Sequence, residues 1–388
     1  MSNSRVCEIK VIYDDVDITK DIQPMIESFS YTDKTKNTEC DDMSIVLNNS
    51  SGLWSSSWMP SAGVKFQALI TCRNWFNQGD NFVRDCGVFE IDSINEAGLP
   101  SVFNISCLSI GITNKINAQE NSQTWENKDF KGIAEELVSR NGFEFMYCSD
   151  YNPIVGRWEQ VQESDISVLK KICEYAGFLI KITGEMIILF RAEEFDKREP
   201  EITIKKSEVS KDNGYSFSMN TSDVYSAVEV KYYDSQKKEM VEYLYYPDGI
   251  SGIRGFSKEE KEKPEATRTI DQDTRMEIII EAPEQEDEEL PEIKDPEVGK
   301  VLRINQRVES IEDAEHLAKS LLRERNKRQL TATLNSIGRP DLYSGITVKL
   351  EGFGIWDTAN WYIEQVSHEK SASSGYTSSI ELRGTVGF

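Results

Sequence analysis

Residues 86–111, CGVFEIDSINEAGLPSVFNISCLSIG, contain two runs of alternating apolar and polar residues on either side of a Gly-Leu-Pro segment. Phe89 and Ile91 alternate with acidic residues in the first run, and Phe103 and Ile105 alternate with polar residues in the second. Alternation with a period of two is typical of a β-strand with one buried face, and Gly and Pro are typical of turns. We therefore predict a strand, a connection and a returning strand.

The same pattern closes the chain in residues 361–384, WYIEQVSHEKSASSGYTSSIELRG. An acidic residue, Asp92 or Glu364, follows the central isoleucine in each copy. Because it recurs in both copies, we interpret it as structural or interfacial rather than catalytic. The repeat predicts a buried core whose members are Phe89, Ile91, Ile94, Trp361, Ile363 and Val366.

Matches upstream of both copies extend the repeat. Residues 43–48 resemble residues 330–335, residues 60–66 resemble residues 340–348, and residues 8–14 resemble residues 229–234. A duplicated antiparallel β unit is therefore predicted. The alternative is that alternating strands resemble one another without any duplication.

The composition limits the classes of function. The 388-residue chain carries 44 basic and 67 acidic residues, for a formal net charge of −23. Such a chain is long enough for two or three domains, and its charge disfavours specific nucleic-acid binding because phosphates would be repelled. The basic run at residues 319–328 is typical of a solvated helix face. No apolar run reaches the ~20 residues that span a bilayer, and no leader is recognisable, so we expect a chain made and kept in the cytoplasm.

Helical patterns separate the two β units. Apolar residues at helical spacing predict a helix that starts near residue 128 and ends at Asn141-Gly142, and a second helix with Ser164 as its N-cap and Gly177 beyond its end. A third helix is predicted from Ser310, and a hairpin around residues 183–185.

The predicted fold class is mainly β with an α+β insertion, in which two similar antiparallel β-barrel domains are joined by a smaller α+β domain. The predicted boundaries are 1–111 for the first β-barrel, 112–200 for the α+β domain, 201–247 with 299–388 for the second β-barrel including a helix at 310–328, and 248–298 for an acidic insertion. Within this insertion we predict one strand at residues 276–280.

No constellation of catalytic or ligand-binding residues is recognisable. His316 and His368 lack the spacing that places two ligands on one metal. The seven cysteines form no C-x-x-C pair, and we interpret them as free, mostly buried thiols, with Cys107 and Cys173 on apolar faces. We predict no catalytic residue, metal or cofactor. A Cys-His nucleophile pair stays arithmetically open, although no cysteine lies in a recognisable nucleophile context. A carboxylate pair for glycoside hydrolysis also stays open, because 67 acids allow many pairings.

Together these patterns resemble the late control protein D family, the central baseplate hub of contractile phage tails, which includes the hub half of type VI secretion spike proteins. The resemblance covers nearly the whole chain. Its carriers are residues 87–92 with the returning strand, residues 160–165 leading into a helix with Leu169, the helix of Ala314, Leu317 and Ala318, and Gly345 before residues 346–348.

The resemblance implies a structural protein that is not an enzyme. It implies two tail-tube-like barrels per chain, a homotrimer forming a pseudo-six-fold ring, and a role as adaptor between a six-fold tail tube and a three-fold spike. Implied partners are the tail tube protein, the spike protein, other baseplate proteins and a tape-measure protein. The particle would be a phage, a prophage or a phage-tail-like bacteriocin, assembled in the bacterial cytoplasm. Because no hydrolase or needle pattern follows Phe388, we expect another chain to supply spike or lytic activity.

Two alternatives stay open. A carbohydrate- or receptor-binding β module of a tail would use Trp54, Trp58, Trp356 and Trp361 as stacking platforms for sugars. A cell-wall hydrolase would need a specific Asp or Glu, and the sequence singles out none.

Overall fold

The computed structural model describes residues 4–35, 40–61, 63–109, 120–183, 186–211, 213–220, 224–234, 238–247, 251–253, 267–270, 277–280, 299–306, 308 and 310–385. The chain forms a main unit, Met1–Asp223 with Asn326–Phe388, and a small unit, Val224–Arg325. As predicted, the fold is mainly β with large antiparallel sheets and a smaller α+β module.

The first repeat contains the elements before residue 110. They are β1 (Val6–Tyr13), β2 (Val16–Asp17), α1 (Thr19–Ile22), η1 (Gln23–Met25), β3 (Ile26–Lys34), β4 (Asp42–Asn48), β5 (Lys65–Arg73), β6 (Asn81–Ala97) and β7 (Val102–Ser109). The strands lie in the order β3-β4-β7-β6-β5-β1-β2, and every neighbouring pair is antiparallel. Alternate residues of β4 and β7 are buried, so the period-two pattern does place one face in a core.

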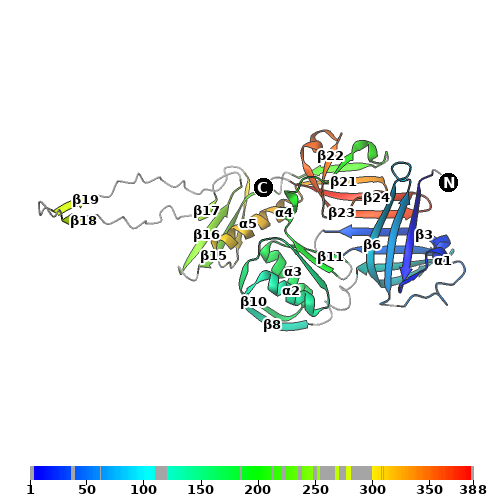
Figure 1. Cartoon of the computed structure of the whole chain (residues 1–388), viewed down its shortest axis with the longest axis horizontal. Helices are drawn as coiled ribbons and strands as arrows, with labels where there is room; N and C mark the ends of the chain where they lie inside the picture. Colours follow the sequence, from blue (N-terminus) through cyan, green and yellow to red (C-terminus); the bar gives the residue numbers. More distant parts are fainter. Residues whose placement is uncertain are drawn as a thin grey trace. The chain divides into compact units, whose positions relative to one another are not determined.

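The second repeat is assembled from two separate parts of the chain. Its elements are β13 (Ile202–Lys205), η2 (Lys206–Glu208), β14 (Tyr215–Met219), β21 (Leu330–Ile337), β22 (Thr347–Glu351), η3 (Gly354–Thr358), β23 (Asn360–Ser371) and β24 (Gly375–Gly384). The strand order β14-β21-β24-β23-β22-β13 has the same plan as β3-β4-β7-β6-β5-β1 of the first repeat. The two repeats share one 13-stranded sheet, in which β3 and β23 are neighbouring strands (Figure 1). Their buried side chains form separate cores.

A β-bulge occurs at the same place in both repeats. In the first repeat the pairing of β6 with β7 skips Asp92, and in the second the pairing of β23 with β24 skips Glu364. A bulge inserts one unpaired residue and bends the strand. The recurring acidic residue therefore marks a bend in the longest strand of each repeat.

The strand registers correct one of the sequence matches. Ile45 pairs with Ile105, and Leu334 pairs with Ile380, at equivalent places in the two repeats. Ile45 therefore corresponds to Leu334, whereas the sequence match aligned it with Ala332. A shift of two residues keeps every side chain on its face, so alternation alone does not distinguish the two registers.

The α+β module lies between the repeats in the chain. Its elements are β8 (Glu120–Asp129), α2 (Phe130–Arg140), β9 (Glu144–Cys148), β10 (Ile154–Ser164), α3 (Asp165–Ala176), β11 (Leu179–Thr183), β12 (Met186–Phe190) and α4 (Ala192–Asp196). The N-cap of α3 is Ser164, and Gly177 ends the helix in the left-handed conformation, as predicted. The N-cap of α2 is Asp129, one residue beyond the expected start. The predicted hairpin strands β11 and β12 pair, and their two connecting residues lie outside the described ranges.

The small unit corrects the predicted second barrel. It contains β15 (Tyr225–Asp234), β16 (Glu239–Tyr245), β17 (Gly252–Ile253), β18 (Thr267–Ile270), β19 (Glu277–Ile280), β20 (Lys300–Asn305) and α5 (Ile311–Asn326). The strand at residues 229–234 was matched to β1, but it is the interior β15 of a separate four-stranded sheet. The place equivalent to β1 belongs to β13, which runs parallel to β22. A strand pattern specifies a face but not the partner strand, and this ambiguity explains the error.

The structure confirms the predicted helix start at Ser310, whereas it describes only part of the predicted insertion at residues 248–298. The Ser310 hydroxyl accepts a hydrogen bond from the Asp313 amide at 3.0 Å, so the predicted start of α5 is confirmed. The predicted strand at 276–280 corresponds to β19, which pairs with β18. Most of the predicted acidic insertion, residues 248–298, lies outside the described residues.

The buried tryptophan of the second repeat provides a stability test. Trp361 is fully buried, and its Nε1 donates to the Trp356 carbonyl at 3.0 Å. We expect Trp361→Ala to lower the free energy of unfolding by about 3–5 kcal/mol, because it leaves a cavity. Trp58→Ala, at a site 38% exposed, should cost less than about 1 kcal/mol. Chemical denaturation measures both, and equal losses would contradict this account of the core.

Candidate assembly surface

The two repeats are joined edge to edge by strands β3 and β23. Residues 28–34 of β3 pair antiparallel with residues 365–371 of β23. The pairing begins directly after the bulge, where the Thr35 amide donates to the Glu364 carbonyl at 2.9 Å. Before the bulge, β23 pairs instead with β22. The bend therefore allows β23 to pair with β22 before the bulge and with β3 after it, along the same edge.

The equivalent edge of the first repeat is open. Strand β6 pairs with β5 only as far as Glu90, and beyond the bulge residues 93–97 pair with β7 on one side. Within the described residues, no strand pairs with the other side of this segment. Residues 93–97 of β6 are equivalent to the part of β23 that pairs with β3 in the second repeat.

The second open edge is strand β14, which occupies the place of β3. It pairs with β21 and ends the 13-stranded sheet, so no described strand covers its outer edge. Tyr215 and Met219 are 46% and 56% exposed there. Uncovered strand edges are surfaces that accept another strand.

Hydrogen bonds fix which residues of β14 point outward. The Asn335 amide donates to the Gly214 carbonyl, and the Asn220 amide donates to the Gln329 carbonyl, both at 2.8 Å. Residues of even number therefore direct their backbone groups toward β21, because the direction alternates along a strand. The odd residues Tyr215, Phe217 and Met219 direct theirs outward.

The internal junction supplies a register for the two open edges. In it, the outward residues Phe29, Tyr31 and Asp33 pair with Lys370, His368 and Val366. Replacing each residue by its equivalent pairs Tyr215 with Gly98, Phe217 with Glu96, and Met219 with Ile94. The three β14 residues in this register are also the three whose backbone groups point outward. The register taken from the internal junction therefore agrees with the hydrogen bonding of β14.

A buried ionic cluster around Asp33 lies at the internal junction. The Asp33 carboxylate is 3.0 Å from Arg84 Nη2 of the first repeat and 2.5 Å from Lys181 Nζ of the α+β module. The Ser344 amide, from the second repeat, donates to it at 3.1 Å. Burial raises the pKa of Asp33, but the charge and hydrogen bond of Lys181 hold it below its ordinary value. One carboxylate thus connects three parts of the main unit.

Asp41 is the second carboxylate beside Lys181, and its pKa is shifted in the opposite direction to that of Asp33. Asp41 Oδ1 lies 3.7 Å from Lys181 Nζ and accepts the Lys34 amide at 2.9 Å. Burial raises the pKa of Asp41 to about 7, although Lys181 opposes this shift. Asp33 is therefore the main ionic partner of Lys181 at neutral pH.

His368 is a buried structural residue of the junction. Its ring stacks on Tyr31 with centroids 5.9 Å apart, and its Nδ1 lies 3.1 Å from Ser378 Oγ and 2.9 Å from the Tyr376 hydroxyl. Burial, together with the charge of Arg84, lowers the pKa of His368 to about 4. The imidazole is therefore neutral at pH 7 and serves packing and hydrogen bonding.

Further contacts connect the second repeat to the rest of the main unit. Arg383 of β24 is 2.7 Å from Asp196 of α4 and lies over the Tyr362 ring. Trp75 Nε1 of the first repeat donates to the Gly338 carbonyl at 2.5 Å. These contacts hold the two repeats in one arrangement.

The predicted core residues fall into two separate cores. Phe89 and Ile91 are buried in the first repeat, and the half-buried Ile94 packs against the same core. Trp361, Ile363 and Val366 are fully buried in the second repeat. Ile94 also lies on the open segment of β6, a position that the sequence did not reveal.

The residues of the rival hypotheses lie elsewhere. Trp54 is buried and stacks on Phe103, and Trp361 is fully buried, so neither ring offers a face to a sugar. Trp58 is 38% exposed, and the half-buried Trp356 stacks on Phe217. The tryptophans thus form no shared platform of exposed rings.

Cys107, Cys173 and the two histidines lie on four different elements, β7, α3, α5 and β23. Burial raises the pKa of Cys107 to about 12 and that of Cys173 well above its ordinary value, so both remain protonated at pH 7. His316 lies in α5 and His368 in β23. Among the described residues, no group of three His, Cys, Asp or Glu side chains is placed to hold a metal ion, and no helix has the length and apolar character to cross a membrane.

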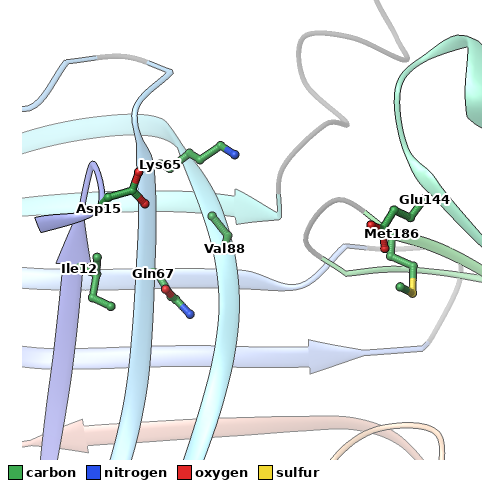
Figure 2. A pocket seen from close by; sticks show the side chains of 7 residues that line it. All are labelled: Ile12, Asp15, Lys65, Gln67, Val88, Glu144 and Met186. Carbon is green, nitrogen blue, oxygen red and sulfur yellow. The ribbon is translucent and has the colours of Figure 1, made fainter. Parts of the chain in front are cut away.

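A pocket of about 370 Å³ lies between the first repeat and the α+β module (Figure 2). Its lining residues are Ile12, Asp15, Lys65, Gln67, Val88, Glu144 and Met186. This lining includes no Ser, Thr, Cys or His, so it lacks the hydroxyl or thiol nucleophile and the imidazole base of Ser-His and Cys-His hydrolases. Its two carboxylates, Asp15 and Glu144, are both exposed to solvent.

The buried histidine predicts a pH dependence of stability. The folded pKa of about 4 lies below the ordinary value of 6.5, so the unfolded chain binds more protons between these values. The stability contributed by neutral His368 should therefore rise as pH rises from 4 to 6.5. We expect the unfolding free energy of wild type minus that of His368→Gln to increase by about 3 kcal/mol across this window.

Urea denaturation at several pH values measures this difference. Tyr376→Phe is the matched control, because it removes a contact of His368 but keeps the imidazole, so its pH dependence should follow that of wild type. A difference that stays flat between pH 4 and 6.5 would contradict the burial of a neutral histidine.

The sequence matches no protein-family model and no curated protein. Its structure is similar to the tail protein from Neisseria meningitidis MC58, with a TM-score of 0.63, 11% identity, and coverage of 97% of this chain and 96% of that one. It is also similar to the 43 kDa tail protein of prophage MuSo2 from Shewanella oneidensis, with a TM-score of 0.60, 11% identity and 97% coverage of both chains.

A third similar structure is the prophage tail protein gp18 from Listeria monocytogenes EGD-e, with a TM-score of 0.51, 10% identity, and coverage of 96% of this chain and 94% of that one. At these identities the likeness concerns the fold. The predicted resemblance to tail proteins is confirmed at that level, and the chain has, over nearly its whole length, the fold of these three tail proteins, two of which come from prophages.

Proposed function

We propose that this chain is a structural baseplate hub of a contractile tail, in a phage, a prophage or a phage-tail-like bacteriocin. Three copies would form a ring with six similar repeats, so that one face fits a six-fold tail tube and the other a three-fold spike. The fold shared with tail proteins supports a role in a tail. Partners would be the tube, the spike, other baseplate proteins and a tape-measure protein.

The observation that carries this proposal is the repeated edge geometry. Within one chain, β3 of the first repeat pairs with the bent half of β23 in the second. The equivalent strand β14 and the equivalent half of β6 are both uncovered within the described residues. Pairing β14 of one copy with β6 of the next would repeat the internal junction between chains. Such a head-to-tail contact closes into a ring when its rotation allows.

Ring closure at three copies is inferred from symmetry. Each chain supplies two repeats, so three chains supply the six positions that a six-fold tube would meet. The internal junction and the junction between chains would then alternate around the ring. The two are similar but not identical, which is compatible with three-fold symmetry on the spike side.

Light scattering of the purified chain, alone and with tube and spike partners, tests the proposed assembly. We expect a trimer, either alone or with the spike. Met219→Pro should leave a monomer, because proline removes an outward N–H that the neighbour would accept. Met219→Ala keeps this N–H and should still assemble. A wild-type chain that remains a monomer with every partner would overturn the proposal.

A cross-linking experiment tests the register separately from the mass. The register places Met219 of one chain opposite Ile94 of the next, so the double variant Met219→Cys with Ile94→Cys should form disulfides between chains under mild oxidation. Met219→Cys with Asn95→Cys is the matched control, because neighbouring residues face opposite sides of a strand. Covalent trimers should appear on a denaturing gel only for the first pair. Trimers in solution with equal cross-linking in both variants would refute the register but not the ring.

A further inference from the structure

Two cysteines face each other across the first repeat. In the antiparallel pairing of β1 with β5, Cys7 lies directly opposite Cys72. Residues at such positions point to the same face, with Cβ atoms roughly 4.5–5.5 Å apart. A disulfide needs Cβ atoms roughly 3.5–4.5 Å apart and Cα atoms within about 7 Å. A small approach of the two strands would therefore allow a sulfur–sulfur bond.

The two thiols have different environments. Cys72 is buried in the core of the first repeat, whereas Cys7 is half-buried at the edge of that core. A hydrogen bond with Cys72 lowers the pKa of Cys7, and the positive charge of Lys370 contributes to the same effect. The same contact raises the pKa of Cys72, and the burial of Cys72 contributes to the same shift. The arrangement consists of a half-buried thiol whose pKa is lowered, a fully buried thiol in contact with it, and a lysine whose positive charge favours the thiolate form of the first.

The other buried cysteines lack this arrangement. Burial raises the pKa of Cys86, Cys107 and Cys173. A thiol reacts with oxidants as the thiolate, so these three should be slow.

We propose that Cys7 and Cys72 form a redox site, in which a hydroperoxide converts the facing thiols into a disulfide that joins β1 to β5. The Cys7 thiolate attacks the peroxide, so that a sulfur–oxygen bond forms, the oxygen–oxygen bond breaks, and the leaving oxygen takes a proton from water. The Cys72 sulfur then attacks the sulfenic acid of Cys7. A sulfur–sulfur bond forms, and hydroxide leaves with the Cys72 proton as water. Two electrons pass from the sulfurs to the peroxide.

The disulfide would fasten a strand near the end of the sheet. β1 pairs with β5 on one side and with the two-residue β2 on the other. Closing the segment between residues 7 and 72 restricts the unfolded chain, which stabilises the folded state. A chain made in a reducing cytoplasm would gain this bond once it meets an oxidant.

Peroxide treatment of the full-length, reduced protein tests the site. After quenching, the protein is unfolded, alkylated with N-ethylmaleimide and analysed by intact mass and peptide mapping. We expect five of the seven cysteines to be alkylated and one peptide pair to link Cys7 with Cys72. The oxidised protein should also unfold at a higher urea concentration than the reduced one. Seven alkylated cysteines, or a link between other cysteines, would overturn the proposal.

Variants separate the steps of the reaction. Cys7→Ser should keep all six remaining cysteines alkylatable after peroxide. Cys72→Ser should leave Cys7 as a sulfenic acid that dimedone traps, and Lys370→Gln should slow the reaction without changing its product. Cys107→Ser is the matched control and should still link Cys7 with Cys72. If Cys72→Ser does not fold, the other two variants still decide the outcome. A disulfide formed in Cys7→Ser, or a reaction rate unchanged in Lys370→Gln, would contradict the assigned roles.

Discussion

The arrangement of the main unit depends on the pairing of β3 with β23. An exposed strand edge presents unpaired amides and carbonyls, and a protein must cover, bend or charge such an edge. Here the bulge at Glu364 bends β23 away from β22 and toward β3, so two repeats become one sheet. The Asp33 cluster fixes this joint because one buried carboxylate needs Arg84, Lys181 and Ser344 together. Removing any one of them would leave a buried charge with fewer partners.

Both repeats contain the same bulged strand and the same edge strand, but only one bulged strand and one edge strand pair with each other within the chain. The bulge at Asp92 repeats the one at Glu364, and β14 repeats the place of β3, but neither equivalent edge is covered by a described strand. The chain therefore contains one complete junction, between β3 and β23, and two uncovered edges, on β14 and β6, that are equivalent to the two sides of that junction. The alternation of hydrogen bonding along β14 agrees with the register that the internal junction supplies. This agreement supports the proposal that the open edges pair with those of a second copy of the chain.

Several parts of the fold followed from local chemistry. Ser164 and Gly177 bound a helix because a hydroxyl caps free amides and glycine adopts the left-handed conformation, and neither effect needs distant residues. The strands of residues 86–111 and 361–384 were predictable because alternation needs only one buried face. The assembly surface was not predictable in this way. Ile94 was recognised as a core position, but its place on an open edge depends on how far β5 extends.

The sequence by itself determined the two strand–turn–strand copies, the helices and the resemblance to tail proteins, because these reside in spacing and in local capping. The tertiary structure decided which strands are neighbours. It moved residues 225–234 into a separate sheet, shifted the match of Ile45 by two residues, and placed Cys7 opposite Cys72 and Lys181 beside Asp33. A period of two specifies the buried face of a strand and nothing about its partner or register. Contacts between residues far apart in the chain are therefore fixed only when the sheet is assembled.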